Sequence, residues 1–220
     1  MSTLQKFDRA LMGLIAVTLI ATVAIYFWDK EYFWGTFAAE DTLVEYGTAL
    51  FLLVASVVLA AHAVSLGARG ARVAMVLTAI YALMFFFASG EEISWGQRIF
   101  GWESGEFFQA HNKQDETNLH NLIVGDFHLA KTLFGPILTT CILLYLVALP
   151  LLYPRVPAIA RLADRLAVPV PWLRHAGIAL ASSIVIALID VSRKWEVYEL
   201  IFALLAVSIF ILPQNREKIT

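Results

Sequence analysis

The sequence predicts an all-α protein, a six-helix transmembrane bundle with a polar outer-side loop or helix between spans three and four. The first observation is composition: the 220 residues are 60% hydrophobic and 15% charged, with a mean hydropathy of +0.72. Soluble globular domains are far more polar. The second is the recurrence of apolar runs near the ~20 residues that cross a bilayer as a helix. The third is the uneven distribution of charge between the connections of these runs.

Six apolar segments are long enough, or nearly long enough, to span a membrane. They are Ala10–Trp28, Leu43–Leu66, Val73–Ala88, Thr132–Tyr153, Trp172–Ile189 and Val197–Leu212. Together they leave no room for a separate soluble domain, so residues 1–220 are predicted to form one integral membrane domain. The first run is long for a signal peptide and ends in a poor cleavage site, Phe27 to Lys30, so it is expected to be a retained span.

The basic residues predict the orientation. Of the sixteen Lys and Arg, ten lie in the two tails and in the second and fourth connections, the last taken as far as Arg174. The positive-inside rule then places both termini in the cytoplasm. Fifteen of the eighteen acidic residues, and five of the six tryptophans, fall on the opposite, outer side. An acidic, solvated surface with an aromatic belt is one explanation of that side, and a functional site is the other.

The fourth connection contains a short helical pattern between prolines. Ile159, Leu162 and Leu166 are spaced at helical intervals, with Arg161 and Arg165 between them. This pattern predicts an amphipathic helix that lies on the anionic cytoplasmic leaflet and anchors the protein there.

The third connection carries the densest set of ionisable residues. Glu91 and Glu92 follow directly on an apolar run, and ionisable groups at the edge of hydrocarbon are functional candidates. If the helix continues, Glu91, Trp95 and Arg98 share a face. A local tether between Glu91 and Arg98 is the structural alternative. As a site, the adjacent carboxylates suit a general acid or base or a cation ligand, and Arg98 suits an anion holder.

Further along, Glu116 and His120 are four residues apart in QDETNLHNL. On a helix they would face the same way, as carboxylate and imidazole ligands of a divalent metal such as zinc do. His111 and His128 could complete a four-ligand site. A capped helix with a surface histidine is the alternative. The asparagines and glutamine around these residues predict a hydrogen-bonded amide network.

Two other outer connections contribute acids. Thr42 and Glu45 match a capping box, which favours a structural role for Glu45. Glu40 and Asp41 are not explained by that motif. Glu196 suits the first turn of the last span, where a carboxylate complements the helix dipole. Glu199 is a better functional candidate, and either Glu199 or Glu40 is expected at the wall of a pocket formed by the third connection.

Several function classes are excluded or disfavoured. No basic stripe suggests a nucleic-acid partner. The chain has no Gly-rich phosphate loop, dinucleotide fingerprint, nucleophile elbow or paired cysteines. Its single cysteine, Cys141, cannot form an intrachain disulfide. The centres of the predicted spans are nearly free of acids, which disfavours an ion or proton pathway.

The motifs EEISWGQR and ETNLHN, preceded by AAEDTLVEYGTALF, resemble a family of uncharacterised bacterial polytopic membrane proteins. The resemblance covers most of the chain and implies a multi-pass protein of the bacterial cytoplasmic (inner) membrane. It implies no activity.

Two functions follow as expectations. The first is a metal-assisted hydrolase or transferase acting on a lipid or lipid-linked substrate, with Glu91, Glu92, Arg98, Glu116 and His120 as catalytic residues. The metal would be held by Glu116, His120, His111 and His128. The second is a non-enzymatic accessory subunit whose polar outer face docks partner membrane subunits.

Overall fold

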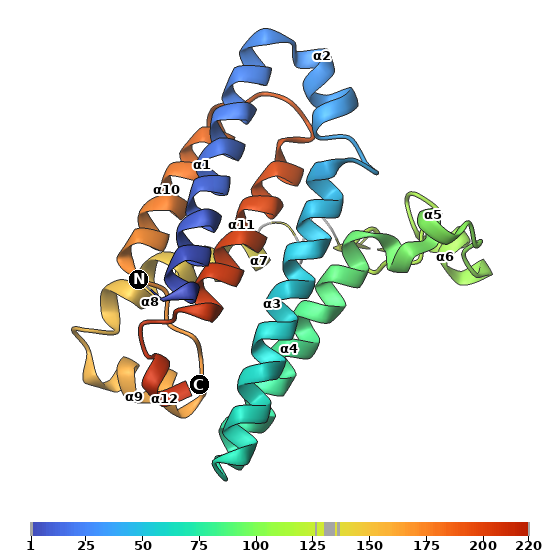
Figure 1. Ribbon diagram of the computed structural model, residues 1–220. Coiled ribbons are helices and arrows are strands. Elements are labelled where there is room, and N and C mark those ends of the chain that lie inside the picture. Colours follow the sequence, from blue (N-terminus) through green and yellow to red (C-terminus); the bar gives the residue numbers. More distant parts are fainter. Residues whose placement is uncertain (1, 126, 130–134, 136, 220) are drawn as a thin grey trace.

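A computed structural model describes residues 2–125, 127–129, 135 and 137–219, and α-helices make up most of this chain (Figure 1). The long helices are α1 (Thr3–Trp28), α3 (Leu43–Ala68), α4 (Arg72–Glu92), α10 (Leu173–Leu188) and α11 (Lys194–Ile211). The shorter helical elements are α2 (Lys30–Tyr32), η1 (Phe33–Phe37), η2 (Ser94–Gly96), α5 (Gln97–Phe100), α6 (Glu106–His111), α7 (Leu138–Leu143), η4 (Leu144–Ala148), α8 (Leu149–Leu152), α9 (Pro157–Arg165) and α12 (Arg216–Ile219). Strands β1 (Ile123–Val124) and β2 (Phe127–His128) form a small antiparallel hairpin.

Three of the described helices, α1, α3 and α4, are long and apolar enough to cross a membrane. The expected spans at Trp172–Ile189 and Thr132–Tyr153 coincide with shorter apolar helices, Leu173–Leu188 and Leu138–Leu152. Residues 132–134 and 136 of the latter span lie outside the described residues. Helix α11 begins with Lys194 and contains Glu196 and Glu199, so its first turns are more polar than those of a simple span.

Helix α11 is the centre of the bundle and packs against α1, α3 and α10. Its residues from Ala203 to Ile211 are buried without interruption. A helix that is apolar around its whole circumference needs neighbours on every side, which accounts for its central place. The first half of α11 is less enclosed, and this is where its two glutamates lie.

Helices α3 and α4 form an antiparallel hairpin. Gly70 closes the turn with φ +76, a backbone conformation that glycine adopts without steric cost. Two serine hydroxyls then donate across the pair: Ser56 Oγ to the Ala82 carbonyl and Ser89 Oγ to the Ala49 carbonyl, both at 2.7 Å. Such interhelical hydrogen bonds hold helices together where hydrocarbon gives no hydrophobic driving force between them.

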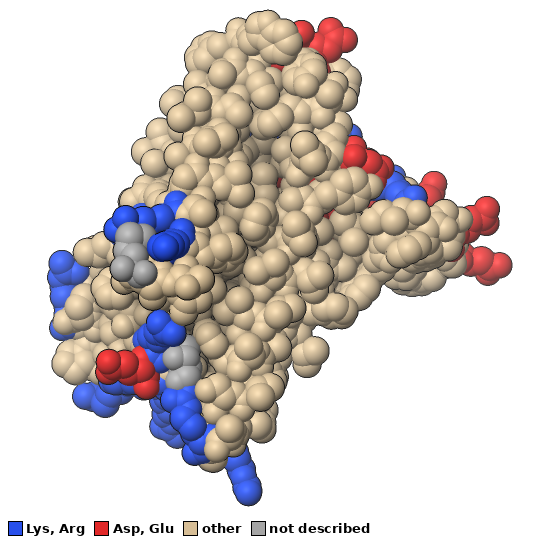
Figure 2. Space-filling model, in the orientation of Figure 1, with Lys and Arg blue, Asp and Glu red and all other residues tan. Residues whose placement is uncertain are grey.

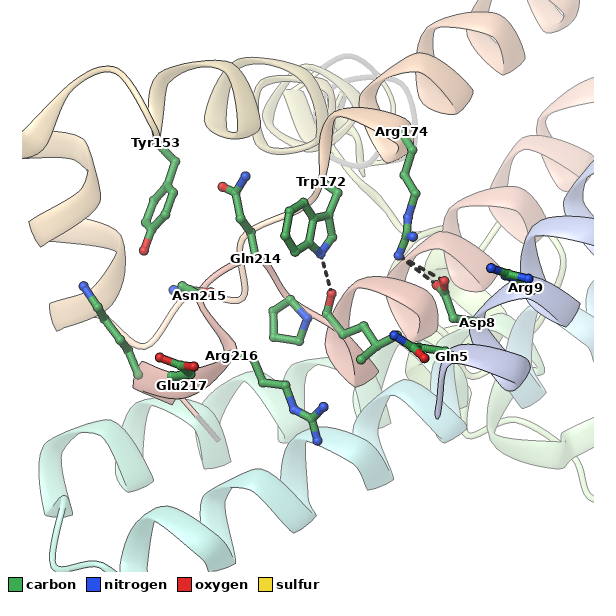
Figure 3. A pocket seen from close by; sticks show the side chains of 13 residues that line it. Gln5, Asp8, Arg9, Tyr153, Trp172, Arg174, Gln214, Asn215, Arg216 and Glu217 are labelled. Atoms are coloured by element: carbon green, nitrogen blue, oxygen red, sulfur yellow. Dashed lines mark hydrogen bonds and ion pairs between the residues drawn. The ribbon is translucent and has the colours of Figure 1, made fainter. Parts of the chain in front are cut away.

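A buried network of polar side chains links α1, α10 and α11 near the termini. Ser208 Oγ donates to Asp8 Oδ1 at 2.5 Å and lies 3.0 Å from His175 Nε2. All three residues are buried. Arg174 Nη2 joins this network through a salt bridge to Asp8 Oδ2 at 3.0 Å (Figure 3). Because each polar group has a partner, this network is compatible with burial.

Both termini, α9, α12 and the turn between α3 and α4 lie at one end of the bundle, which we call the basic end (Figure 1). On the face drawn in Figure 2, blue Lys and Arg side chains gather at this end. Most red Asp and Glu side chains lie at the opposite end and on the lobe that contains α5 and α6. We call that opposite end the acidic end. The amphipathic helix expected in the fourth connection is present as α9.

Helix α9 is fastened to the C-terminal segment through Asp164. Its carboxylate accepts hydrogen bonds from Tyr153, Asn215 and Lys218 at 2.9, 3.0 and 2.8 Å. Partial burial would raise the pKa of Asp164, but these three donors outweigh it and hold the pKa below the ordinary value of 3.8.

Replacing Asp164 by Asn is expected to lower the thermal stability of the protein near neutral pH. A carboxylate whose pKa is lowered by folding stabilises the protein above its unfolded value, and the contribution disappears as the pH falls through the folded value. The difference in melting temperature between wild type and Asp164→Asn should therefore shrink from pH 6 toward about pH 3. The exposed Glu103→Gln is the control. A pH-independent difference would assign the effect to packing.

Candidate functional site

Arg98 is the centre of a charged cluster at the acidic end. Its guanidinium forms salt bridges with four carboxylates: Glu40 at 3.2 Å, Asp41 at 3.1 Å, Glu45 at 2.7 Å and Glu116 at 2.7 Å. Partial burial would lower the pKa of Arg98, but the four carboxylates outweigh it and raise the pKa above its usual value. The Arg98 guanidinium therefore stays charged, and its N–H donors are already bound by carboxylates of the protein. This arrangement does not leave Arg98 as the open anion holder that the sequence suggested.

A sharp break after α4 places Arg98 in this cluster. Ser94, Trp95 and Gly96 have φ values of +46, +56 and +78, so three successive residues adopt left-handed conformations. The shared face of Glu91, Trp95 and Arg98 required the helix to continue, and the helix ends at Glu92. Trp95 still reaches back, and its Nε1 donates to Glu91 Oε1 at 3.0 Å. Arg98 is directed instead toward acids from the connection between α1 and α3 and from the segment after α6.

Glu116 and His120 do not share a helix face either, because residues 112–122 form turns closed by a bridge between Asn112 and Leu122. Glu116 is buried and faces Arg98. Its other oxygen accepts from Ser94 Oγ at 2.6 Å and from Asn118 Nδ2 at 2.8 Å. The carboxylate is thus held by three protein donors.

His120 is paired with Glu91 instead. Its Nδ1 lies 3.7 Å from Glu91 Oε2, and its side chain is partly exposed. Glu91 is buried and is fixed by the backbone N–H of Leu119 at 2.5 Å as well as by Trp95. A carboxylate that is itself anchored can orient an imidazole, which is the arrangement found behind many histidine bases and metal ligands.

The expected amide network is present around these residues. Asn112 Nδ2 donates to both the carbonyl and the side-chain oxygen of Asn118, at 3.0 and 2.9 Å. Gln97 Oε1 accepts from the Thr117 backbone N–H and the Ser104 hydroxyl. These bonds fold residues 94–122 into a lobe that stands off the side of the bundle, which we call the outer lobe (Figure 1).

The four proposed metal ligands do not come together as one group of the described residues. Glu116 is turned to Arg98 and His120 to Glu91. His111 is exposed on α6, where its Nδ1 lies 2.8 Å from the Phe107 carbonyl and its ring stacks on the Phe107 ring. His128 lies in β2. The metal site predicted from the helical spacing of Glu116 and His120 is therefore not formed, because the segment that carries these two residues is not helical.

Three other carboxylates converge instead. One oxygen each of Glu92, Glu196 and Glu199 lies within 4.8 Å of the others, which is close enough for one cation to contact all three. Glu92 ends α4, whereas the other two lie one turn apart in α11. Glu92 and Glu196 are half-buried and Glu199 is exposed. We call these residues the carboxylate trio.

The carboxylate trio differs from every other acid near it in its partners. The acids around Arg98 are neutralised by a cation, and Glu91 accepts several N–H groups. Within the described part of the chain, by contrast, no hydrogen bond or salt bridge reaches the side chains of the trio.

The sequence favoured Glu199 over Glu196 and expected Glu199 or Glu40 at the wall of the pocket formed by the third connection. The structure brings Glu199 to Glu92 and Glu40 to Arg98. Glu92 is more than 100 residues from Glu196 and Glu199 in the sequence, and the packing of α4 against α11 brings them together. Glu45 was explained wrongly as part of a capping box. The Thr42 side chain makes no cap hydrogen bond to α3 and donates instead to the Ala39 carbonyl at 2.7 Å. Glu45 is bound to Arg98 and to the Asp41 backbone N–H.

No family model, curated protein or solved structure matches this chain. The assignment of a function therefore depends on the chemistry of the site itself.

Proposed function

We propose that this protein is a polytopic membrane enzyme that hydrolyses or transfers a group on a lipid or lipid-linked substrate, using a divalent cation held by the carboxylate trio. The observation that carries the proposal is the convergence of Glu92, Glu196 and Glu199 within 4.8 Å without protein donors among the described residues. Three carboxylates at this spacing repel one another unless a cation or a shared proton relieves the repulsion.

The ligand set indicates the kind of cation. Three carboxylates are an all-oxygen set, which suits Mg²⁺, Mn²⁺ or Ca²⁺ better than zinc. When bound, such a cation would polarise a phosphoryl or carbonyl oxygen of the substrate. The exposure of Glu199 leaves an open side on which a substrate could approach.

The pair of Glu91 and His120 supplies the proton chemistry in this proposal. His120 is paired with Glu91, the residue next to Glu92 of the carboxylate trio. Its imidazole, oriented by the anchored Glu91, would accept the proton of an attacking water or hydroxyl and return it to the leaving group. Arg98 and Glu116 act as positioning residues, because they fix the segments that carry Glu91 and His120.

The place of the site in the fold supports a substrate from the bilayer. Glu92 is the last residue of α4, a helix that could cross a membrane. The trio would then lie at the membrane boundary, within reach of lipid headgroups. As part of the proposal, all six apolar segments cross a bacterial inner membrane, and the basic end, with both termini, faces the cytoplasm.

The proposal is tested by lipid turnover. Purified protein, reconstituted with a total bacterial lipid extract and Mn²⁺, should convert at least one lipid species detectable by mass spectrometry. His120→Ala and Glu91→Gln should lower the rate by roughly 10²-fold or more, as expected for loss of a general base or its orienter. His111→Ala, a histidine exposed on α6, is the matched control and should keep full activity. Equal rates for all variants would contradict the assigned roles.

A second function, the accessory subunit, is favoured by the surface of the outer lobe. Ile99, Phe100 and Phe107 are 53%, 78% and 57% exposed, which gives the lobe an apolar surface suited to a partner or to lipid. A fixed partner that co-purifies in constant ratio, together with no lipid turnover and no cation binding, would favour this function over the enzyme.

A further inference from the structure

The outer lobe has an apolar surface formed by side chains of two short helices and of the turns that flank α5. Ile99 and Phe100 of α5 and Phe107 of α6 are exposed. Two tryptophans of the lobe, Trp95 and Trp102, are exposed as well. Large apolar side chains that remain open in a folded protein mark a surface for another molecule or for lipid.

This surface is continuous with the exposed side of α4. The Trp95 ring packs edge-to-face against Phe86 and Phe87, with ring centroids 6.2 and 5.4 Å apart. Both phenylalanines are exposed near the end of α4. Because α4 is long and apolar enough to cross a membrane and little of it is buried in the bundle, its exposed rings would face lipid. The apolar surface of the lobe therefore begins where a lipid-facing surface ends.

The part of the lobe next to α4 exposes almost no charge. The ten residues ISWGQRIFGW, from Ile93 to Trp102, contain one ionisable side chain, that of Arg98. Its guanidinium is directed to four carboxylates of the protein. In Figure 2 the red side chains of the lobe lie at its tip and upper edge, whereas its lower edge, toward α4, is tan. An apolar side combined with a polar tip is typical of segments that lie in a membrane interface.

The direction of the lobe agrees with such a position. Helix α4 ends at Glu92, and the left-handed residues Ser94, Trp95 and Gly96 turn the chain away from the helix axis. Helices α5 and α6 consequently stand beside the bundle (Figure 1). A segment that leaves a membrane-crossing helix sideways at its end runs along the membrane surface, where amphipathic elements bury their apolar side.

We propose that the outer lobe is an interfacial element whose apolar surface inserts into the bilayer at the boundary between headgroups and acyl chains. Its tryptophans favour this boundary. The exposed acids of the lobe, among them Glu103 and Glu106, provide no attraction to anionic lipids. The lobe therefore recognises the apolar boundary itself, whatever the charge of the headgroups. This inference goes beyond the proposed enzyme, because it requires neither a cation nor a reaction.

The test measures the depth of single fluorophores in the full-length protein reconstituted into phosphatidylcholine vesicles. In a Cys141→Ser background, an environment-sensitive dye is attached to Phe100→Cys or, separately, to Phe107→Cys. These positions lie in different helices, so a failure of one variant to fold leaves the other. Leu83→Cys, exposed in the middle of α4, is the reference for a deep position, and Lys113→Cys, exposed in the turns after α6, is the control for a position in water. The quenchers are aqueous iodide and lipids that carry a nitroxide near the headgroup or near the end of the acyl chain.

We expect the dyes of Phe100→Cys and Phe107→Cys to emit at shorter wavelength than the dye of Lys113→Cys. They should be quenched most by the shallow nitroxide, whereas the dye of Leu83→Cys should be quenched most by the deep one. Replacing part of the phosphatidylcholine by phosphatidylglycerol should leave this pattern unchanged.

Two outcomes would overturn the proposal. If iodide quenched the dyes of Phe100→Cys and Phe107→Cys as strongly as that of Lys113→Cys, the lobe would lie in water and its apolar surface would be left for a protein partner. If lipid contact occurred only with phosphatidylglycerol, the contact would be electrostatic rather than apolar. Neither outcome bears on the carboxylate trio, since the test involves no divalent cation and no turnover.

Discussion

Replacing Arg98 by Gln is expected to destabilise the folded protein by roughly 1–3 kcal/mol, which is less than for breaking a fully buried ion pair because part of the network is exposed to solvent. The substitution would leave four carboxylates without their cation, two of them buried: Glu45 and Glu116. The outer lobe would lose its link to the connection between α1 and α3. Unfolding in mixed micelles, followed by circular dichroism, measures the change.

Two variants make this test specific. Arg98→Lys keeps the charge but not the planar fork that reaches several carboxylates, so its stability should lie between wild type and Arg98→Gln. Arg72→Gln removes an exposed arginine at the basic end and should change stability by less than about 0.5 kcal/mol. If Arg98→Gln were as stable as wild type, the salt bridges of Arg98 would not hold the lobe, and the placement of Glu91 and His120 would need another cause.

Single Glu→Gln substitutions in the carboxylate trio are expected to have effects of opposite sign with and without a cation. Without added divalent cation, each of Glu92→Gln, Glu196→Gln and Glu199→Gln should raise the melting temperature, because it removes a repulsion between neighbouring carboxylates. With Mn²⁺ at about 100 times its dissociation constant, wild type should gain about 2.7 kcal/mol of stability. The variants should gain much less, since each lacks one ligand.

Titration of Mn²⁺, Mg²⁺ and Ca²⁺ against the melting temperature makes this measurement, and calorimetry gives the affinities. A loss of at least tenfold in affinity is expected for each variant, as for removal of residues that hold or support a metal. Glu103→Gln, an exposed acid of the outer lobe, should behave like wild type in both conditions. A wild-type melting temperature that no divalent cation changes would mean that the trio shares a proton, and the metal-assisted reaction would then be abandoned.

The sequence by itself predicted those helices whose formation depends on the local pattern of apolar residues. Hydrophobic runs predicted α1, α3 and α4 because a helix in hydrocarbon must be apolar along its length, which is a local property. The helical spacing of apolar and basic residues in the fourth connection predicted α9, because an amphipathic pattern is also a local property of the sequence. The density of amides between Asn112 and Asn121 predicted a hydrogen-bonded network, because so many donors and acceptors beside an apolar run need partners.

The sequence predicted a pocket of ionisable groups from the third connection with Glu199 or Glu40 at its wall, and only the tertiary structure decided which of these groups pair. Spacing rules assume that a helix continues, but Ser94, Trp95 and Gly96 end α4 in left-handed conformations, and this break redirects Arg98 and Glu116 toward each other. The pairing of Glu91 with His120 and the convergence of Glu92 with Glu196 and Glu199 join residues distant in the chain. Such contacts depend on how helices pack and on where turns reverse the chain, and those are properties of the whole bundle rather than of any one segment.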